Sequence, residues 1–162
     1  MLNGKDLMIN RSVLLILLLL LTACGKQDEP PQNKHEAEVD KLFETLANER
    51  WFTKEQLIAG QQVFANNCIA CHGERAGGTV ADWQQRLPND KYPPPPLDGT
   101  AHAWHHSLSI LRRSINEGGQ QIGGTMPAMK NKLNEVQITN VLAYITSLWP
   151  NETYQRWAAI HQ

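Results

Sequence analysis

Apolar side chains recur at helical spacing in five parts of the chain beyond residue 38, and no stretch alternates in the manner of a β-strand. The strongest pattern covers residues 134–149, where an apolar stripe is ended by Pro150. A helix from Thr53 to Cys68 is predicted by a capping box, in which Gln56 bonds back to the start of the first turn. Weaker patterns predict helices over 39–50, 106–116 and 154–160. The predicted fold class is therefore all-α.

Glycine and proline separate these helices by long loops. The four prolines at 93–96 exclude both a helix interior and a central strand. Gly118 and Gly119 end the helix over 106–116, and Gly123 and Gly124 open another loop. Such long loops are unusual in a compact domain unless something fills the space between the helices.

The beginning of the chain has the pattern of a secretion signal. Lys5 and Arg11 precede nine apolar residues, 13–21, which as a helix would rise about 14 Å, roughly half the thickness of a bilayer core. A basic start and a short apolar core are typical of a signal peptide. The following Leu21-Thr22-Ala23-Cys24 resembles the lipobox of bacterial lipoproteins, which implies cleavage before Cys24 and its diacylation. The alternative is an ordinary signal peptide with a chance cysteine at its end.

Charge is nearly balanced, with 15 Lys and Arg against 16 Asp and Glu, so no basic excess indicates nucleic acid as a partner. Residues 25–50 hold seven acidic and four basic side chains and few large apolar ones. We therefore predict a lipoprotein signal peptide at 1–23, a lipidated, charged tether at 24–50 and one functional domain at 51–162.

The chemistry of that domain is indicated by Cys68-Ile69-Ala70-Cys71-His72. C-x-x-C-H is the attachment motif of c-type haem: the thiols of Cys68 and Cys71 bond to the porphyrin, and His72 supplies a nitrogen ligand to the iron. A thioredoxin-type dithiol needs a βαβ setting, which the sequence lacks, and a zinc site of this kind needs a second cysteine pair. We therefore predict one covalent haem c.

Segment 54–149 resembles a class I (mitochondrial-type) cytochrome c domain. Gly60 with Phe64, and Leu142-Ala143-Tyr144-Ile145, are similar to the parts of the first and last helices that cross closely in that family. The resemblance implies the cytochrome c fold, with helices and long loops wrapped around one covalently bound haem. The stretch 73–92 is longer than in compact members of the family, and the resemblance leaves the role of this loop open.

Two further segments carry the same resemblance. Pro95-Pro96-Leu97-Asp98-Gly99 is similar to the P-x-L-x-G loop, which implies that the Pro95 carbonyl accepts the proton of the second histidine nitrogen and that Leu97 packs on the haem ring. Met126-Pro127-Ala128 is similar to the segment that supplies the distal sulfur ligand. Met126 is thus the expected second metal ligand.

Other side chains compete for the distal position. We interpret Met129 as a packing residue. Three neighbouring histidines could reach the iron or hold copper or zinc instead, although the favoured interpretation is a solvated loop that leads into the next helix: His102, His105 and His106.

The predicted function is single-electron transfer in a periplasmic or membrane-surface respiratory chain, with redox proteins as donor and acceptor. No nucleophile or acid–base pair is visible, so the chain is expected to be a carrier and not an enzyme. The alternatives are a haem enzyme subunit or gas sensor with an open or weakly held iron position, and a metal-handling lipoprotein that uses the histidines of 102–106.

The anchor is expected to be separable from the haem chemistry. Two acyl chains hold a protein stably on a membrane, and their loss releases it. Cys24→Ser, exported through a conventional signal, should therefore yield a haem-loaded protein in the soluble fraction, as checked by fractionation and haem staining. A wild-type protein that is already soluble after export would show that Cys24 carries no lipid.

Overall fold

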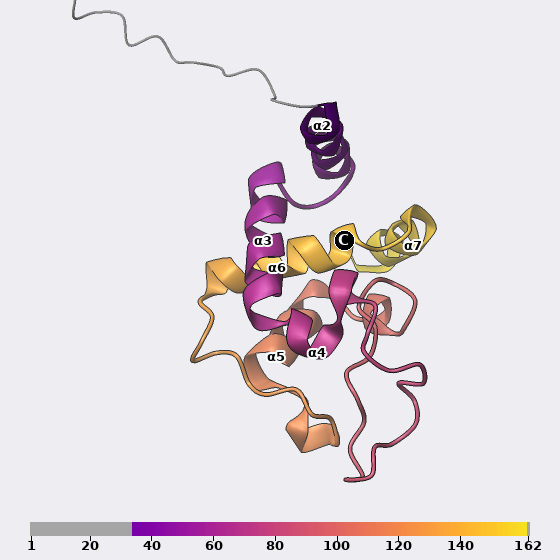
Figure 1. Ribbon diagram of the computed structural model, residues 1–162. Helices are drawn as coiled ribbons and strands as arrows, with labels where there is room; N and C mark the ends of the chain where they lie inside the picture. The colour runs from indigo at the N-terminus through magenta and orange to yellow at the C-terminus, as the bar shows by residue number, and fades with distance from the viewer. Residues whose placement is uncertain (1–33, 162) are drawn as a thin grey trace, which may run out of the picture. The chain divides into compact units, whose positions relative to one another are not determined.

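The computed structural model describes residues 34–161, and the regular structure in this range is helical (Figure 1). The single β feature among these residues is an isolated bridge between Tyr92 and Gly124. The all-α prediction is therefore confirmed. The α-helices are α2 (Lys34–Glu49), α3 (Lys54–Asn67), α4 (Ile69–His72), α5 (Leu108–Glu117), α6 (Glu135–Ser147) and α7 (Asn151–His161), with 3-10 turns η2 (Glu74–Ala76), η3 (Ala103–His105) and η4 (Gln120–Ile122).

The chain divides into two compact units, Met1–Ala37 and Glu38–Gln162. The predicted signal peptide and Cys24 lie outside the described residues. Within 34–161, no helix is long and apolar enough to cross a membrane.

Local capping explains where the two longest predicted helices of the domain begin. The Thr53 hydroxyl accepts from the Gln56 amide at 3.3 Å, and the Gln56 side chain accepts from the Thr53 amide at 2.9 Å. Asn134 and Gln137 form the same reciprocal pair at the start of α6. Both starts agree with the sequence, because each capping box is complete within four residues.

The helix predicted over 106–116 begins later than expected. Ser107 is its cap, with its hydroxyl 3.4 Å from the Ile110 amide, so that α5 starts at Leu108. His106 has an extended backbone and follows the turn η3. Its carbonyl accepts from the Trp157 indole at 2.8 Å, a contact across 51 residues that local patterns do not reveal.

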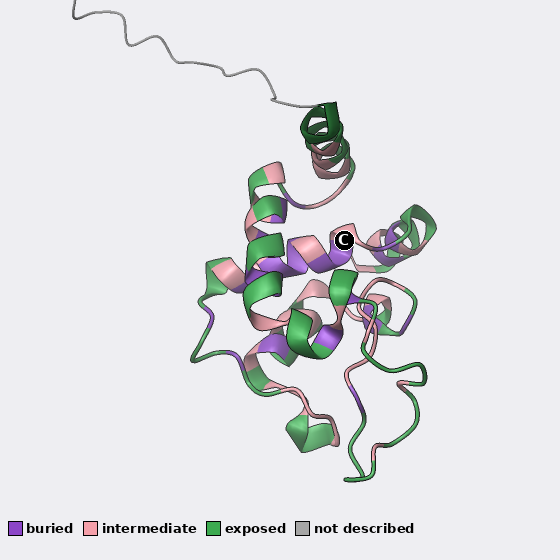
Figure 2. Ribbon diagram, viewed as in Figure 1, coloured by how far each residue is buried: buried purple, intermediate pink, exposed green. Residues whose placement is uncertain are grey.

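Helix α2 starts five residues before the predicted segment and has no buried residue (Figure 2). Its inner face nevertheless contacts the domain, since Phe43 and Leu46 pack on the cluster around Phe52 and Leu57. Lys54 adds ion pairs to two acidic side chains of α2, at 2.6 and 3.0 Å. Because such pairs at the surface contribute little, the apolar contacts carry most of this attachment.

The core of the domain forms where α3 crosses α6. At the crossing, a β-carbon on Gly60 would lie 1.9 Å from the Asn140 carbonyl oxygen, so only glycine permits this approach of the two backbones. Phe64 and Tyr144 pack beside it, with ring centroids 5.2 Å apart and planes inclined by 51°. Figure 2 shows the buried face of α6 that results. The close packing expected between the segment with Gly60 and Phe64 and the segment 142–145 is therefore confirmed.

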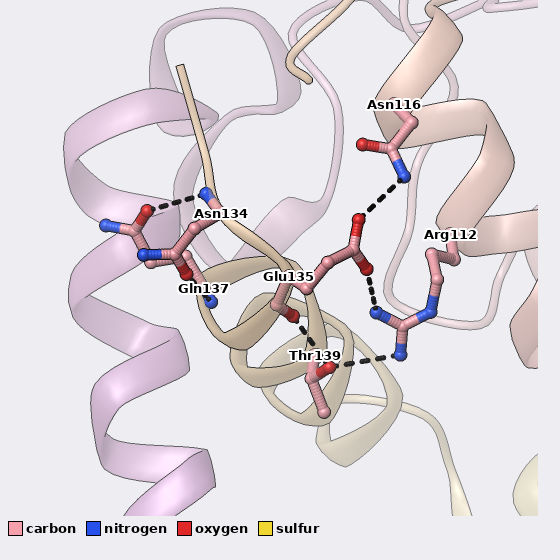
Figure 3. A network of polar contacts seen from close by, with 6 residues as sticks. All are labelled: Arg112, Asn116, Asn134, Glu135, Gln137 and Thr139. Atoms are coloured by element: carbon pink, nitrogen blue, oxygen red, sulfur yellow. Dashed lines mark hydrogen bonds and ion pairs between the residues drawn. The ribbon is translucent and has the colours of Figure 1, made fainter. Parts of the chain in front are cut away.

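Helix α5 is joined to the first turn of α6 by a polar network (Figure 3). Glu135 accepts from Arg112 at 3.0 Å and from Asn116 at 3.5 Å, and Arg112 also donates to the Thr139 hydroxyl at 3.0 Å. The carboxylate lies at the start of α6, where the helix dipole favours negative charge.

Because α3 and α6 cross so closely at Gly60, we expect one added methyl group there to destabilise the protein strongly. Gly60→Ala should destabilise the haem-loaded protein by about 3 kcal/mol or more, since the backbone of α6 must move. Gly77→Ala is the matched control, because its β-carbon would find its nearest atom at an ordinary 3.6 Å, and it should change stability by less than about 0.5 kcal/mol. Denaturant unfolding measures both, and equal stabilities would contradict the proposed crossing.

Candidate functional site

The C-x-x-C-H segment follows directly from the end of α3 and forms the short helix α4. The Cys68 amide donates to the Phe64 carbonyl at 2.8 Å, and the amides of Cys71 and His72 donate to the Cys68 carbonyl at 3.1 and 2.9 Å. Neither cysteine is in a disulfide; Cys68 is half-buried and Cys71 is exposed. Burial raises the pKa of the Cys68 thiol to about 11, which keeps it neutral. The local fold therefore presents two thiols and an imidazole within one helical turn.

His72 is 7 % exposed, and its Nδ1 lies 3.3 Å from the Pro95 carbonyl oxygen. Because a carbonyl only accepts, this contact assigns the ring proton to Nδ1 and leaves the lone pair of Nε2 for a metal. Burial lowers the pKa of His72, and the bond to Pro95 opposes that shift. Burial thus favours the neutral ring, which is the form that binds iron.

The proline-rich loop is fixed at Leu97, two residues after Pro95. The Leu97 amide donates to the Ala76 carbonyl at 2.7 Å, and the Leu97 carbonyl accepts from the Trp149 indole at 2.8 Å. Gly99 has φ +92°, and a β-carbon there would lie 2.9 Å from the Pro150 ring. The glycine of this loop is thus required by both conformation and space.

The segment that contains Met126 runs against the end of α5. The Gly119 amide donates to the Met126 carbonyl at 2.9 Å, and the Met129 amide donates to the Ile115 carbonyl at 3.0 Å. Gly118 has φ +75°, and a β-carbon there would lie 2.6 Å from the Met126 carbonyl oxygen. These contacts fix the backbone at Met126 and at Met129.

Two adjoining cavities, of about 200 and 370 Å³, share His72, Leu97 and Met126 in their walls. The first also contains Cys68 and Cys71 and is closed by apolar side chains of α6. Met129 lines only this first cavity and is 7 % exposed, as expected of a packing residue. The second cavity has no cysteine and includes four aromatic or imidazole rings besides His72: Trp83, Tyr92, His102 and His106.

The residues that surround these cavities fit a covalently bound haem. Two free thiols, an imidazole nitrogen and a thioether sulfur supply the bonds such a group needs, and the walls are largely apolar. In the described part of the chain, no buried side-chain nitrogen or oxygen lacks a hydrogen-bond partner.

The three neighbouring histidines separate into two kinds. His105 stacks on Trp104, with centroids 3.8 Å apart, and lines neither cavity. His102 and His106 lie edge to face, 5.7 Å apart, in the wall of the second cavity. Among residues 34–161 no three His, Cys, Asp or Glu side chains are grouped so that they could hold a metal ion. The alternative of a copper or zinc site at these histidines therefore has no support among the described residues.

The second cavity also contains residues that the sequence did not single out for the site. Tyr92 comes from the long stretch 73–92, and Trp83 reaches the wall from the same stretch. The unusual length of this stretch was the only signal in the sequence.

The comparisons with known proteins agree with this geometry. The family model described as cytochrome c matches residues 57–149, and the chain belongs to that family. As a member of it, the chain carries covalently bound haem c. No solved structure matches the chain.

Among curated proteins, the chain is similar to the cbb3-type cytochrome c oxidase subunit CcoP of Rhodobacter capsulatus, with 35% identity over 97 residues, 56% of this chain and 28% of the relative. It is similar to the FixP subunit of the same oxidase type in Bradyrhizobium, with 30% identity over 90 residues, 56% of this chain and 27% of the relative. It is also similar to cytochrome c6 of Picosynechococcus, with 31% identity over 96 residues, 59% of this chain and 76% of the relative. The match thus spans little more than a quarter of the two oxidase subunits.

Proposed function

We propose that this protein is a monohaem carrier of single electrons in a respiratory chain, with Cys68 and Cys71 bonded to the haem and His72 and Met126 as its axial ligands. The observation that carries this proposal is the pair of adjoining cavities: His72 and Met126 line both, and the cysteines line one. The similarity to oxidase subunits and to cytochrome c6 supports the same role.

The bound haem supplies the one-electron chemistry. The chain's own residues hold it and exclude water. The Pro95 carbonyl fixes the ring orientation of His72 and strengthens it as a ligand. Leu97 and the apolar face of α6 provide a wall of low polarity. If both axial positions of the iron are filled by fixed protein ligands in an apolar cavity, no position is left for a small substrate, and electron transfer is favoured.

Met126 is the better of the two candidate sulfur ligands. Met126 lines both cavities, whereas Met129 lines only the first and is a buried member of the core. A thioether opposite histidine stabilises the reduced iron and raises the potential, which suits a carrier.

The protein is proposed to act without catalysis of its own, with redox proteins as donor and acceptor. Relatives that are named as oxidase subunits support an oxidoreductase as a partner. The competing function is a haem enzyme subunit or gas sensor, which would need an open or weakly held iron position. The nearly balanced charge of the chain supports no role for nucleic acid.

The proposed location follows from the sequence of the first segment. Residues 1–23 are removed as a signal peptide, Cys24 receives the lipid and residues 24–50 form the tether that includes α2. The cytochrome domain, 51–162, then lies in the periplasm or on the outer face of a bacterial membrane.

The ligand assignment is tested by carbon monoxide. Met126→Ala should open one position on the iron, lower the reduction potential and allow the reduced protein to bind carbon monoxide, as seen in its absorption spectrum. Met129→Leu is the matched control and should change none of these. If the reduced wild type binds carbon monoxide readily, the enzyme or sensor function replaces the carrier. If Met126→Ala stays low-spin, the distal ligand is another residue.

The attachment is tested separately. Because each thiol forms its own bond, Cys68→Ala or Cys71→Ala should sharply reduce the amount of matured protein, measured by haem staining on a denaturing gel. Normal staining of both variants would contradict the assignment of the two cysteines.

A further inference from the structure

The proline-rich loop, residues 93–99, is held between two other parts of the protein, and Leu97 bonds to both. Its amide donates to the Ala76 carbonyl at 2.7 Å, in the segment that follows His72. Its carbonyl accepts from the Trp149 indole at 2.8 Å, at the end of α6. The position of the loop relative to His72 therefore depends on Trp149 as well as on the segment that carries the ligand.

Trp149 is itself fixed. It is 2 % exposed, and its ring meets that of Trp157 edge to face at 5.6 Å. Its backbone carbonyl accepts from the Arg50 guanidinium at 3.0 Å, and the same guanidinium donates to the Thr146 carbonyl at 2.6 Å. Arg50 thus binds carbonyls at the C-terminal end of α6, where the helix itself supplies no donors. The indole is consequently a donor of fixed position for the loop.

The hydrogen bond that depends on this loop is a long one. His72 Nδ1 lies 3.3 Å from the Pro95 carbonyl oxygen, whereas N–H···O bonds are typically about 2.9–3.0 Å long. A bond of this length is readily lost when the loop is displaced. Because the bond makes the imidazole a stronger ligand, its loss would weaken the donation of electrons from His72 to the iron.

On the basis of the proposed function, we propose that Trp149 and Arg50 are positioning residues for His72 and thereby lower the reduction potential. Arg50 fixes Trp149, and the Trp149 indole holds the loop where the Pro95 carbonyl accepts from the ligand. Neither residue lines the two cavities, so both act through the loop. Arg50 also precedes the residues 57–149 that match the family model, so its part is a feature of this chain beyond the matched segment.

The direction of the effect follows from ligand strength. A more strongly donating imidazole stabilises oxidised iron more than reduced iron, since the oxidised iron carries the larger positive charge. Without the indole N–H, the partly buried Leu97 carbonyl loses its donor, which is unfavourable, and the loop shifts toward another partner. The bond from His72 to Pro95 then weakens, and the potential rises.

Trp149→Phe tests this in the mature, haem-loaded protein, because it keeps an aromatic ring and removes the N–H. The potential should rise by an amount equivalent to about threefold to tenfold in the equilibrium between oxidised and reduced protein, where tenfold is about 59 mV for one electron. In proton NMR spectra of the reduced protein, the resonance of the His72 Nδ1–H should move upfield, as a weaker hydrogen bond requires.

Trp51→Phe is the matched control. It also removes an indole bond at the end of α6, to the Thr146 hydroxyl at 3.1 Å, but this acceptor is outside the proline-rich loop. A loss of stability can accompany both substitutions, whereas the potential and the Nδ1–H resonance should change only in Trp149→Phe.

Arg50→Gln provides a second test, because it releases the Trp149 carbonyl and leaves the indole in place. The potential should again rise. Lys54→Gln is the control for charge: it also removes one positive charge, and it breaks only ion pairs to α2. Loss of a positive charge by itself favours oxidised iron and lowers the potential, so a rise in Arg50→Gln has the opposite sign. Should Trp149→Phe fail to mature, this second pair of variants decides.

An unchanged potential and Nδ1–H resonance in Trp149→Phe, or equal changes in Trp51→Phe, would overturn the role of Trp149. A potential in Arg50→Gln no higher than in Lys54→Gln would overturn the role of Arg50. In either case the wild type still incorporates haem and excludes carbon monoxide when reduced, so the carrier function stands. A wild type that lacks haem or readily binds carbon monoxide would instead overturn the carrier function.

Discussion

The contact between the backbones of α3 and α6 at Gly60 determines where the reactive side chains lie. Helix α3 continues without a gap into Cys68 through the bond to the Phe64 carbonyl, so the position of α3 on α6 is also the position of the thiols. The face of α6 beside this crossing forms the wall of the first cavity. The close approach of α3 to α6 therefore fixes both the positions of the two cysteines and the cavity wall that α6 forms.

The orientation of His72 depends on a second set of long-range bonds. Its Nδ1 bonds to Pro95, and the loop two residues further on is held by the Trp149 indole at the end of α6. The same end of the molecule holds His106 through the Trp157 indole. Buried indoles require acceptors, and here the acceptors are carbonyls of the loops that line the cavities. Residues at the end of α6 and in α7 thus help to position both the loop that contacts His72 and the backbone of His106.

Sequence patterns predicted those structural features that depend on a few neighbouring residues. The capping box at Thr53 and the C-x-x-C-H motif are of this kind, and the apolar stripe predicted the helix that begins after Asn134. The later start of α5 was missed because His106 is held by Trp157, 51 residues away. The contact of Pro95 with His72 was anticipated only through the family resemblance. Trp83 could not be assigned at all, since its partner, His102, is nineteen positions further along the chain.

The long stretch 73–92 acquires a physical role from this arrangement. A compact loop would leave the end of the second cavity to solvent, whereas this one places Trp83 against His102 and Tyr92 beneath Arg86. Because no Asp, Glu, Lys or Arg side chain of the described residues lines either cavity, the wall that this stretch completes is made of rings and apolar side chains and places no carboxylate, ammonium or guanidinium group beside the site.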